Sequence, residues 1–270
     1  MNKKIVSLIL ISMLAFSAIS VSAFDKSEFD IVLGENPDTI HIYEDIFAIA
    51  YTGPDSDGFI KTVEIDSDGE ITEPYIDNFE FDQIQGLTPD IIKVSGSIYA
   101  IVYSGADDDG FISTLSINNE GYITSIQSLE FETYDCIDPY IIKISSDIFA
   151  IVYGTNLNND GMIQTIQIDS SGNIFELVSP NSRIVFAPWG RQPKLIHIRG
   201  DFYAIAYNDN QNAGFIKTIE IFQNGDLSDL NSDDIRFDRR GRDPDIIHIN
   251  DDFYAVSYPV SYTHLRAHET

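Results

Sequence analysis

The stretch PDTIHIYEDIFAIAY, residues 37–51, decides the fold, because the chain repeats its pattern four more times without an insertion or deletion. The other copies run from Pro89 to Tyr103, from Pro139 to Tyr153, from Pro193 to Tyr207 and from Pro244 to Tyr258. Successive copies start 50 to 54 residues apart. A period of this length indicates a repeat architecture in which each repeat is one supersecondary unit.

Each repeat holds four short segments rich in β-branched and aromatic residues, which favour strands. In the first repeat they are Thr39–Ile42, Phe47–Tyr51, Phe59–Ile65 and Ile71–Phe81. A Gly-containing turn follows the third segment of four repeats, where Gly supplies the positive φ of a hairpin. The first two segments are almost continuously apolar, which favours sheets covered on both faces. We therefore predict an all-β protein, a β-propeller of four-stranded blades with about five repeats visible and the last blade incomplete.

The two ends of the chain differ from the repeats. Residues 1–23 are typical of a secretory signal peptide. They begin with a positively charged segment, continue with an apolar run over residues 5–19, and end in small residues at 21–23. Residues 259–270 break the repeat and resemble the translated read-through of a sequencing adaptor, so we interpret them as a non-native tail. The propeller domain is therefore predicted over residues 24–258, in a secreted or cell-surface protein.

The segment before the first repeat predicts how the ring closes. Glu28–Leu33 precedes Pro37 as the outer-strand residues 78–82 precede Pro89. Because propellers often combine both chain ends in one blade, we expect this segment to add an outer strand to the last blade. The inner strands of that blade are then Asp245–Ile249 and Phe253–Tyr258. The alternative is that the visible repeats belong to a larger ring.

The chain is strongly acidic, with 43 acidic and 16 basic residues and a formal net charge of −27. Such a surface repels polyanions, which excludes nucleic acid and anionic membranes as general partners. No second apolar run reaches membrane-spanning length. Cys136 is the single cysteine, so core packing rather than disulfides must hold this protein together. We interpret Cys136 as a small, partly buried residue.

The repeat also resembles a known one. FYAIAY at residues 202–207, followed by GFIKT at 214–218, is similar to a repeat of exported bacterial and archaeal proteins that are largely uncharacterised. The resemblance covers residues 37–258 and implies a surface or secreted propeller, with no catalytic residues to carry over. The chain lacks the Trp-Asp pair, the kelch glycines and the sialidase box of better-known propellers.

A basic residue stands four positions after each of the five prolines that open the repeated stretch. These residues are His41, Lys93, Lys143, His197 and His248. One interpretation is a cationic ring around the propeller axis that binds an anion. The other, which we favour, is a structural hydrogen-bonded network with the threonines that recur on the third strands. Those threonines are Thr62, Thr114, Thr165 and Thr218.

Acidic residues form two further candidate sites. Asp38, Asp90 and Asp245 directly follow a repeat proline and become neighbours at the axis of a five-bladed ring. Two such carboxylates can serve a glycosidase as acid and base or nucleophile, and they can also bind a cation. The alternative is that these aspartates have only a structural role, at the start of the strand that follows each proline. The loops after the second strands suggest a weak calcium site, with Asp55, Asp57, Asp107 and Asp109 as candidates.

Trp189 is the only tryptophan, and it lies in the same loop as Arg191, which is a cationic exception on an acidic protein. The next equivalent loop carries Arg240 and Arg242. A Trp beside Arg can stack on a sugar ring and bind a carboxylate, which makes these residues candidate ligand-binding groups. The alternative is that Trp189 fills a gap between blades while the arginines pair with nearby aspartates.

Together these patterns favour a non-catalytic binding module, secreted or on the cell surface, for an extracellular glycan or protein ligand. One alternative is a polysaccharide-active enzyme, of the glycoside hydrolase or lyase type, that uses the axial carboxylates. Another is a structural spacer in a larger surface protein. We expect no cofactor other than a possible calcium ion, no insertion into a membrane, and a monomer or part of a larger polypeptide.

Overall fold

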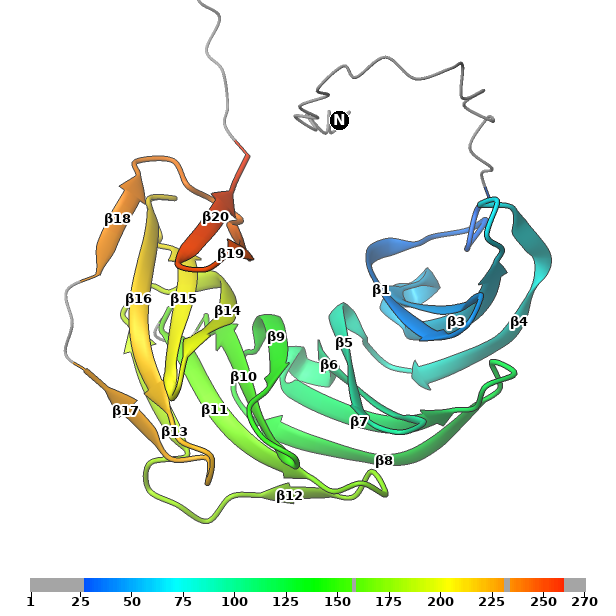
Figure 1. The fold of residues 1–270 in the computed structure, drawn as a ribbon, viewed down its shortest axis with the longest axis horizontal. Coiled ribbons are helices and arrows are strands. Elements are labelled where there is room, and N and C mark those ends of the chain that lie inside the picture. The colour runs from blue at the N-terminus through cyan, green and yellow to red at the C-terminus, as the bar shows by residue number, and fades with distance from the viewer. Residues whose placement is uncertain (1–26, 157–158, 231–233, 260–270) are drawn as a thin grey trace, which may run out of the picture.

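The computed structural model describes residues 27–156, 159–230 and 234–259, so the predicted signal peptide and nearly all of the predicted tail lie outside it. Figure 1 shows an arc of antiparallel sheets arranged around a common axis. This is the predicted β-propeller, with four blades and a fifth, two-stranded sheet in the described part of the chain. No helix among the described residues is long and apolar enough to cross a membrane.

The strands of each blade pair antiparallel in chain order, beginning with the inner strand. The first blade consists of β1 (Glu35–Tyr43), β2 (Ile46–Thr52), β3 (Gly58–Ile65) and β4 (Ile71–Asp82). The second consists of β5 (Leu87–Ser95), β6 (Ile98–Ser104), β7 (Gly110–Ile117) and β8 (Ile123–Glu132). One three-residue 3-10 turn follows β2 and another follows β6, at Pro54–Ser56 and Ala106–Asp108.

The outer strand of the next two blades is divided into two short pieces that pair with the same third strand. The third blade consists of β9 (Ile137–Lys143), β10 (Ile148–Gly154), β11 (Gly161–Ile168), β12 (Ile174–Glu176) and β13 (Arg183–Ala187). The fourth consists of β14 (Arg191–Arg199), β15 (Phe202–Asn208), β16 (Gly214–Ile221), β17 (Leu227–Asp229) and β18 (Ile235–Asp238). The last sheet contains β19 (Asp245–Asn250) and β20 (Phe253–Ser257).

The predicted hairpin turns between third and outer strands are confirmed. Their glycines have φ of 82° to 89°, in the left-handed region that a Cβ atom disfavours; they are Gly69, Gly121, Gly172 and Gly225. Each turn therefore needs a glycine, because a residue with a Cβ atom would be strained at this positive φ.

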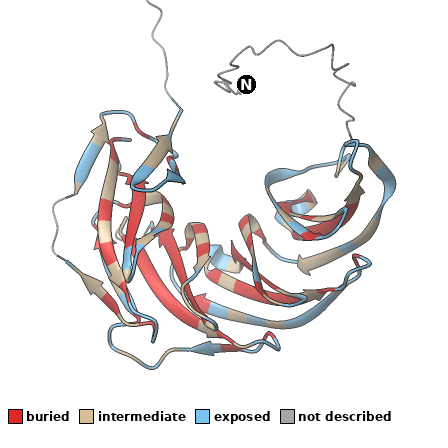
Figure 2. Cartoon of the chain, in the orientation of Figure 1, coloured by how far each residue is buried: buried red, intermediate tan, exposed pale blue. Residues whose placement is uncertain are grey.

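Three apolar cores lie between successive blades (Figure 2). One face of a blade supplies small and aliphatic side chains, such as Ala48 and Ala50 of β2. The facing side of the next blade supplies larger ones, such as Tyr99, Ile101 and Tyr103 of β6. Since both faces of the second strands β6, β10 and β15 are covered, their nearly continuous apolar sequence follows directly from the stacking of blades.

A hydrogen bond between side chain and backbone connects each of the first three blades to the next. The Thr62 hydroxyl of β3 donates to the carbonyl of Gly121 in the second blade, at 2.7 Å. Thr114 donates to Gly172 at 2.7 Å, and Thr165 donates to Gly225 at 2.6 Å. The recurring threonine of the third strand therefore holds the hairpin turn of the following blade.

We expect Thr62→Val to destabilise the protein by about 1–2 kcal/mol, because valine has the same shape but leaves the buried Gly121 carbonyl without its donor. Equilibrium urea unfolding measures this change. Thr124→Val, at an exposed position of β8, is the matched control and should change the free energy of unfolding little. Equal effects of the two substitutions would contradict the role of Thr62.

The predicted closure of the ring by Glu28–Leu33 is wrong for this structure. These residues form no strand; they lie against the first blade, where the Phe29 ring contacts the Tyr51 ring at 5.0 Å between centroids. Asp30 accepts a hydrogen bond from the Tyr51 hydroxyl at 2.9 Å. An outer strand pairs with a third strand, and the described part of the last sheet has none. Figure 1 accordingly shows an open arc, with β1 and β19 on opposite sides of the opening.

Candidate functional site

The residue before each repeat proline has an unusual backbone conformation. Its φ lies between 46° and 54° in all five repeats, although none of the five is glycine; they are Asn36, Thr88, Asp138, Gln192 and Asp243. In the first four blades the register of the inner strand shifts across this residue and the proline, which is a β-bulge. Strained backbone of this kind is concentrated at functional sites, so the bulges direct attention to the axis.

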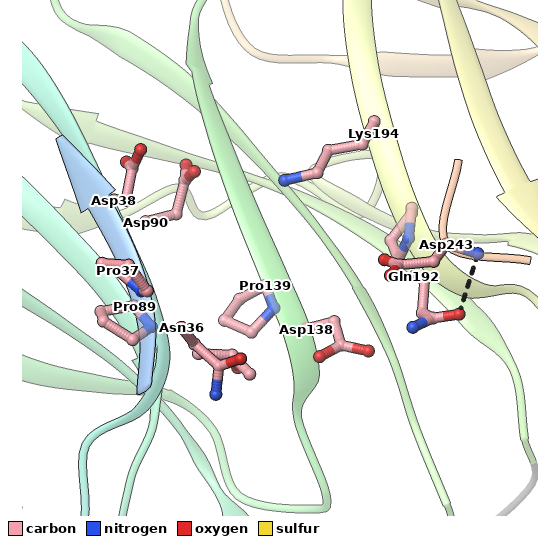
Figure 3. A pocket seen from close by; sticks show the side chains of 12 residues that line it. Asn36, Pro37, Asp38, Pro89, Asp90, Asp138, Pro139, Gln192, Lys194 and Asp243 are labelled. Carbon is pink, nitrogen blue, oxygen red and sulfur yellow. Dashed lines mark hydrogen bonds between the residues drawn. The ribbon is translucent and has the colours of Figure 1, made fainter. Parts of the chain in front are cut away.

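The bulges surround a pocket of about 230 Å³ on the axis (Figure 3). The five residues that precede the repeat prolines line it, together with four of those prolines and with Asp38, Asp90 and Lys194. Figure 3 shows Asp38 beside Asp90, Asp138 and Asp243 on another side, and the Lys194 ammonium directed into the space between them. The pocket therefore combines four carboxyl groups, one amine and several neutral polar groups.

The position after each proline also connects neighbouring blades. Asp38 accepts a hydrogen bond from the backbone N–H of Ile91 in the second blade, at 2.9 Å. Asp90 does the same for Ile141 in the third blade, at 3.0 Å. In the next two blades this position carries Tyr140 and Lys194, and the Lys194 Nζ lies 4.1 Å from the centre of the Tyr140 ring. Asp90 uses one oxygen for this structural contact, whereas both oxygens of Asp38 accept backbone hydrogen bonds, because its Oδ1 also accepts from the Thr39 N–H at 2.9 Å.

The carboxyl group of Asp90 is less well solvated than an ordinary surface carboxyl. Burial raises the pKa of Asp90 to about 7, while the Lys194 ammonium and the Ile141 N–H act in the opposite direction. Burial and the neighbouring Asp243 also raise the pKa of Asp138. Asp90 thus keeps its proton below about pH 7, in a pocket that a small ligand can enter.

The pKa of Asp90 predicts how its contribution to stability depends on pH. The folded pKa of about 7 lies above the ordinary value, so between pH 4 and 7 the unfolded chain loses this proton first. The stability of the wild type relative to Asp90→Asn should therefore fall by about 1–3 kcal/mol as the pH rises from 4 to 8. Urea unfolding of both proteins at pH 4.5, 6 and 8 measures this difference, and a constant difference would contradict it.

The predicted carboxylate set is only partly assembled. Asp38 and Asp90 lie together in the pocket, but Asp245 is not among the described residues that line it. Asp245 accepts a hydrogen bond from its own neighbour Ile246, at 2.9 Å. Its predicted closeness to Asp38 depended on a closed ring, and the arc is open. Sequence reasoning missed Asp138 and Asp243, because the residue before the repeat proline differs in chemistry from one repeat to the next.

The predicted network of basic and threonine side chains does not form as expected. His41, His197 and His248 each bond through Nε2 to the carbonyl of the turn after the inner strand. Lys143 donates to the Val94 carbonyl, and Lys93 lies over the Tyr99 ring. Thr62, Thr114 and Thr165 contact the next blade instead. The reason is the sheet register: His41 is opposite Phe47, and Thr62 is opposite Ala48, so the two side chains point to opposite faces.

The Trp and Arg candidates lie away from the pocket lining described above. Trp189 is 43% exposed and has a φ of 65°. The Arg191 guanidinium donates to the Asn159 side chain at 2.5 Å. In the following loop, the Arg240 backbone N–H donates to Asp238, and Arg242 is exposed. A ligand at this loop pair stays a prediction.

The calcium candidates belong to the two short 3-10 turns. Asp55 and Asp107 have positive φ, whereas Asp57 and Asp109 each lie beside a glutamate of the outer strand. Partial burial and the hydrogen bond with Asp57 raise the pKa of Glu80. No group of three or more His, Cys, Asp or Glu side chains in the described residues is placed to share a metal ion. Calcium at these loops stays a prediction.

Comparisons with known proteins concern the fold. No protein-family model matches the chain, and no curated protein matches its sequence. A thermostable family-43 glycoside hydrolase has a TM-score of 0.48 at 13% identity, covering 88% of this chain and 96% of its own. An α-L-arabinofuranosidase from Lactobacillus brevis has a TM-score of 0.47 at 9% sequence identity, and the match covers 75% of this chain and 74% of the arabinofuranosidase. A protein from Lactobacillus plantarum has a TM-score of 0.46 at 13% sequence identity. The match covers 67% of this chain but only about half (52%) of the length of the Lactobacillus plantarum protein.

Proposed function

We propose that this protein is a secreted or cell-surface, polysaccharide-active enzyme of the glycoside hydrolase or lyase type, and that a sugar unit enters the axial pocket. The observation that carries the proposal is Asp90, a half-buried carboxyl with a pKa of about 7 that lines the pocket beside Asp38. Cleavage of a glycosidic bond needs one carboxyl that is protonated and a second group that acts as base or nucleophile.

Asp90 is suited to be the proton donor. One of its oxygens is fixed by the Ile141 N–H, which orients the carboxyl, and the other remains for a ligand. In a hydrolytic reaction Asp90 gives its proton to the glycosidic oxygen as the bond between this oxygen and the anomeric carbon breaks. Water supplies the new oxygen on that carbon, and Asp38 accepts the proton that the water releases.

The remaining lining fits a carbohydrate. Asn36, Thr88 and Gln192 offer amide and hydroxyl groups for hydrogen bonds with sugar hydroxyls. The Thr88 Oγ1 atom is buried and has no hydrogen-bond partner among the described residues. The prolines supply apolar surface for the C–H face of a sugar ring. A volume of about 230 Å³ is below that of typical drug-sized sites, so it suits one sugar unit at a chain end.

A specific observation favours a second candidate, the non-catalytic glycan-binding module. Asp38 and Asp90 already hold neighbouring blades together, and that role explains acidic residues at these positions without any chemistry. In this alternative, the pocket binds the same sugar unit and releases it unchanged.

One experiment separates the two candidates. The protein is incubated with a panel of plant, algal and bacterial polysaccharides, and reducing ends and unsaturated products are measured beside binding by calorimetry. New chain ends support the enzyme. Binding without new ends supports the module, and neither binding nor cleavage contradicts both and leaves the structural spacer.

A further inference from the structure

Lys194 is the exception among the residues that follow the repeat prolines. This position carries Asp38, Asp90 and Asp245 in three repeats and Tyr140 in a fourth, but it is Lys194 on β14. Lys194 lines the axial pocket, and its ammonium points toward the centre in Figure 3. The pocket thus has one cationic side chain among the residues described as its lining.

The contacts of Lys194 leave its charge unmatched by an ion pair. Lys194 Nζ lies over the Tyr140 ring at 4.1 Å and has no carboxylate oxygen within 4.0 Å in the described part of the chain. The lysines of the third strands behave differently. Lys61 pairs with Asp30 at 3.1 Å, and Lys217 pairs with Asp229 at 3.2 Å. The Tyr140 ring therefore positions Lys194 without occupying its hydrogen-bond donors.

We propose that Lys194 makes the axial pocket selective for an acidic sugar, a uronate whose carboxylate pairs with the Lys194 ammonium. This inference rests on the proposed function, because it assumes that the pocket receives a sugar unit. It goes further by naming the substrate class and the residue that selects it. A carboxylate on C6 of a sugar supplies the anionic acceptor that Lys194 lacks, whereas the hydroxymethyl group of a neutral hexose offers only an uncharged hydroxyl oxygen.

The other charges around Lys194 determine when a uronate can bind. Asp38 on β1, Asp90 on β5, Asp138 on β9 and Asp243 before β19 all line the pocket. Asp245 on β19 also acts on Tyr140, whose pKa is raised to about 12 by burial and by Asp90, Asp245 and Asp38. When Asp90 and Asp138 are ionised, their negative charges repel a uronate and attract the Lys194 ammonium. Their partly buried positions favour the neutral acids, so uronate binding should weaken as pH rises through about 7, and near pH 7 it should be accompanied by proton uptake.

Matched trisaccharides test this inference by calorimetry at pH 5.5 and pH 8. The pairs are trigalacturonate with α-1,4-galactotriose, β-1,4-linked trimannuronate with mannotriose, and β-1,4-linked triglucuronate with cellotriose. For the pair that fits the pocket, we expect the wild type to bind the uronate at least about 10-fold more tightly than the neutral sugar at pH 5.5. This preference should be small at pH 8.

Three variants identify the residue responsible. Lys194→Met should remove the preference and leave the affinity for the neutral sugar within about 3-fold. Lys194→Arg keeps the cation and should preserve it. Lys93→Met is the matched control, because Lys93 also lies over a tyrosine ring, at 5.5 Å, but outside the pocket lining. Thermal unfolding of each variant establishes that it is folded.

The outcomes distinguish this inference from the proposed function. If the wild type binds or cleaves neutral sugars as well as uronates, or if Lys194→Met keeps the preference, the selectivity is overturned and the proposed function stands. If the wild type neither binds nor cleaves any member of the pairs or of the polysaccharide panel, the proposed function itself fails and the inference fails with it.

Discussion

Asp90→Asn is expected to abolish glycosidic cleavage while leaving the fold and sugar binding in place. Asparagine has an oxygen that can still accept the Ile141 N–H bond, now 3.0 Å long, so the contact between the second and third blades survives. It has no proton to give to the leaving oxygen. Loss of a general acid lowers the rate by about 10²–10⁴-fold, and we expect an effect of that size on kcat with little change in sugar affinity.

The measurement is the initial rate of reducing-end release at saturating polysaccharide, with binding followed separately by calorimetry. Asp245→Asn is the matched control, since it changes the same position of the repeat outside the pocket lining. The wild-type rate should also fall as pH rises through about 7, where Asp90 loses its proton. An Asp90→Asn protein that cleaves at the wild-type rate would remove Asp90 from the mechanism.

The blades could be predicted from sequence because their determinants are local. Strand segments and Gly turns lie within about 50 residues of each other, and the expected segments Phe47–Tyr51 and Phe59–Ile65 lie within β2 and β3. The positive φ of Gly69 and its equivalents follows from the turn alone. Repetition then confirms each assignment four times over, which no single strand pattern could do.

Features that depend on packing between distant segments were not predictable in the same way. The division of the outer strand into β12 and β13, and into β17 and β18, leaves no period in the sequence. Whether Glu28–Leu33 joins the last sheet depends on the relative position of the two ends of the arc. The threonine partners depended on register, because a change of one residue turns a side chain to the other face.

The candidate site was half predicted for a similar reason. Asp38 and Asp90 were found because the position after proline recurs with a carboxylate. Asp138 and Asp243 were missed because the position before proline is chemically varied, and only the left-handed bulge turns these side chains toward the axis. The shared feature at this position is the backbone conformation, which sequence letters do not display.

Glu132→Ala is expected to destabilise the protein by about 3 kcal/mol, the largest stability effect that we predict for a side chain. Glu132 is 1% exposed and accepts hydrogen bonds from the Tyr153 hydroxyl at 2.8 Å and from Arg183. It also accepts from the Tyr134 backbone N–H at 3.1 Å. Alanine would leave the buried Tyr153 hydroxyl without an acceptor and would add a cavity. Urea unfolding measures the change in free energy of unfolding.

The fourth blade supports this expectation with a natural exception. The position of Glu132 is occupied in the third blade by Ala187, and the Tyr207 hydroxyl of the fourth blade donates instead to Asp234 of its own blade, at 2.5 Å. The tyrosine that ends each second strand thus has a carboxylate partner even where the usual one is missing, which indicates that its buried hydroxyl requires an acceptor.

Asp238→Ala is the control: the Tyr258–Asp238 pair lies at the solvent-exposed end of the arc, so solvent can replace Asp238 and stability should change little. If Glu132→Ala is no more destabilising than Asp238→Ala, burial does not determine the strength of this contact.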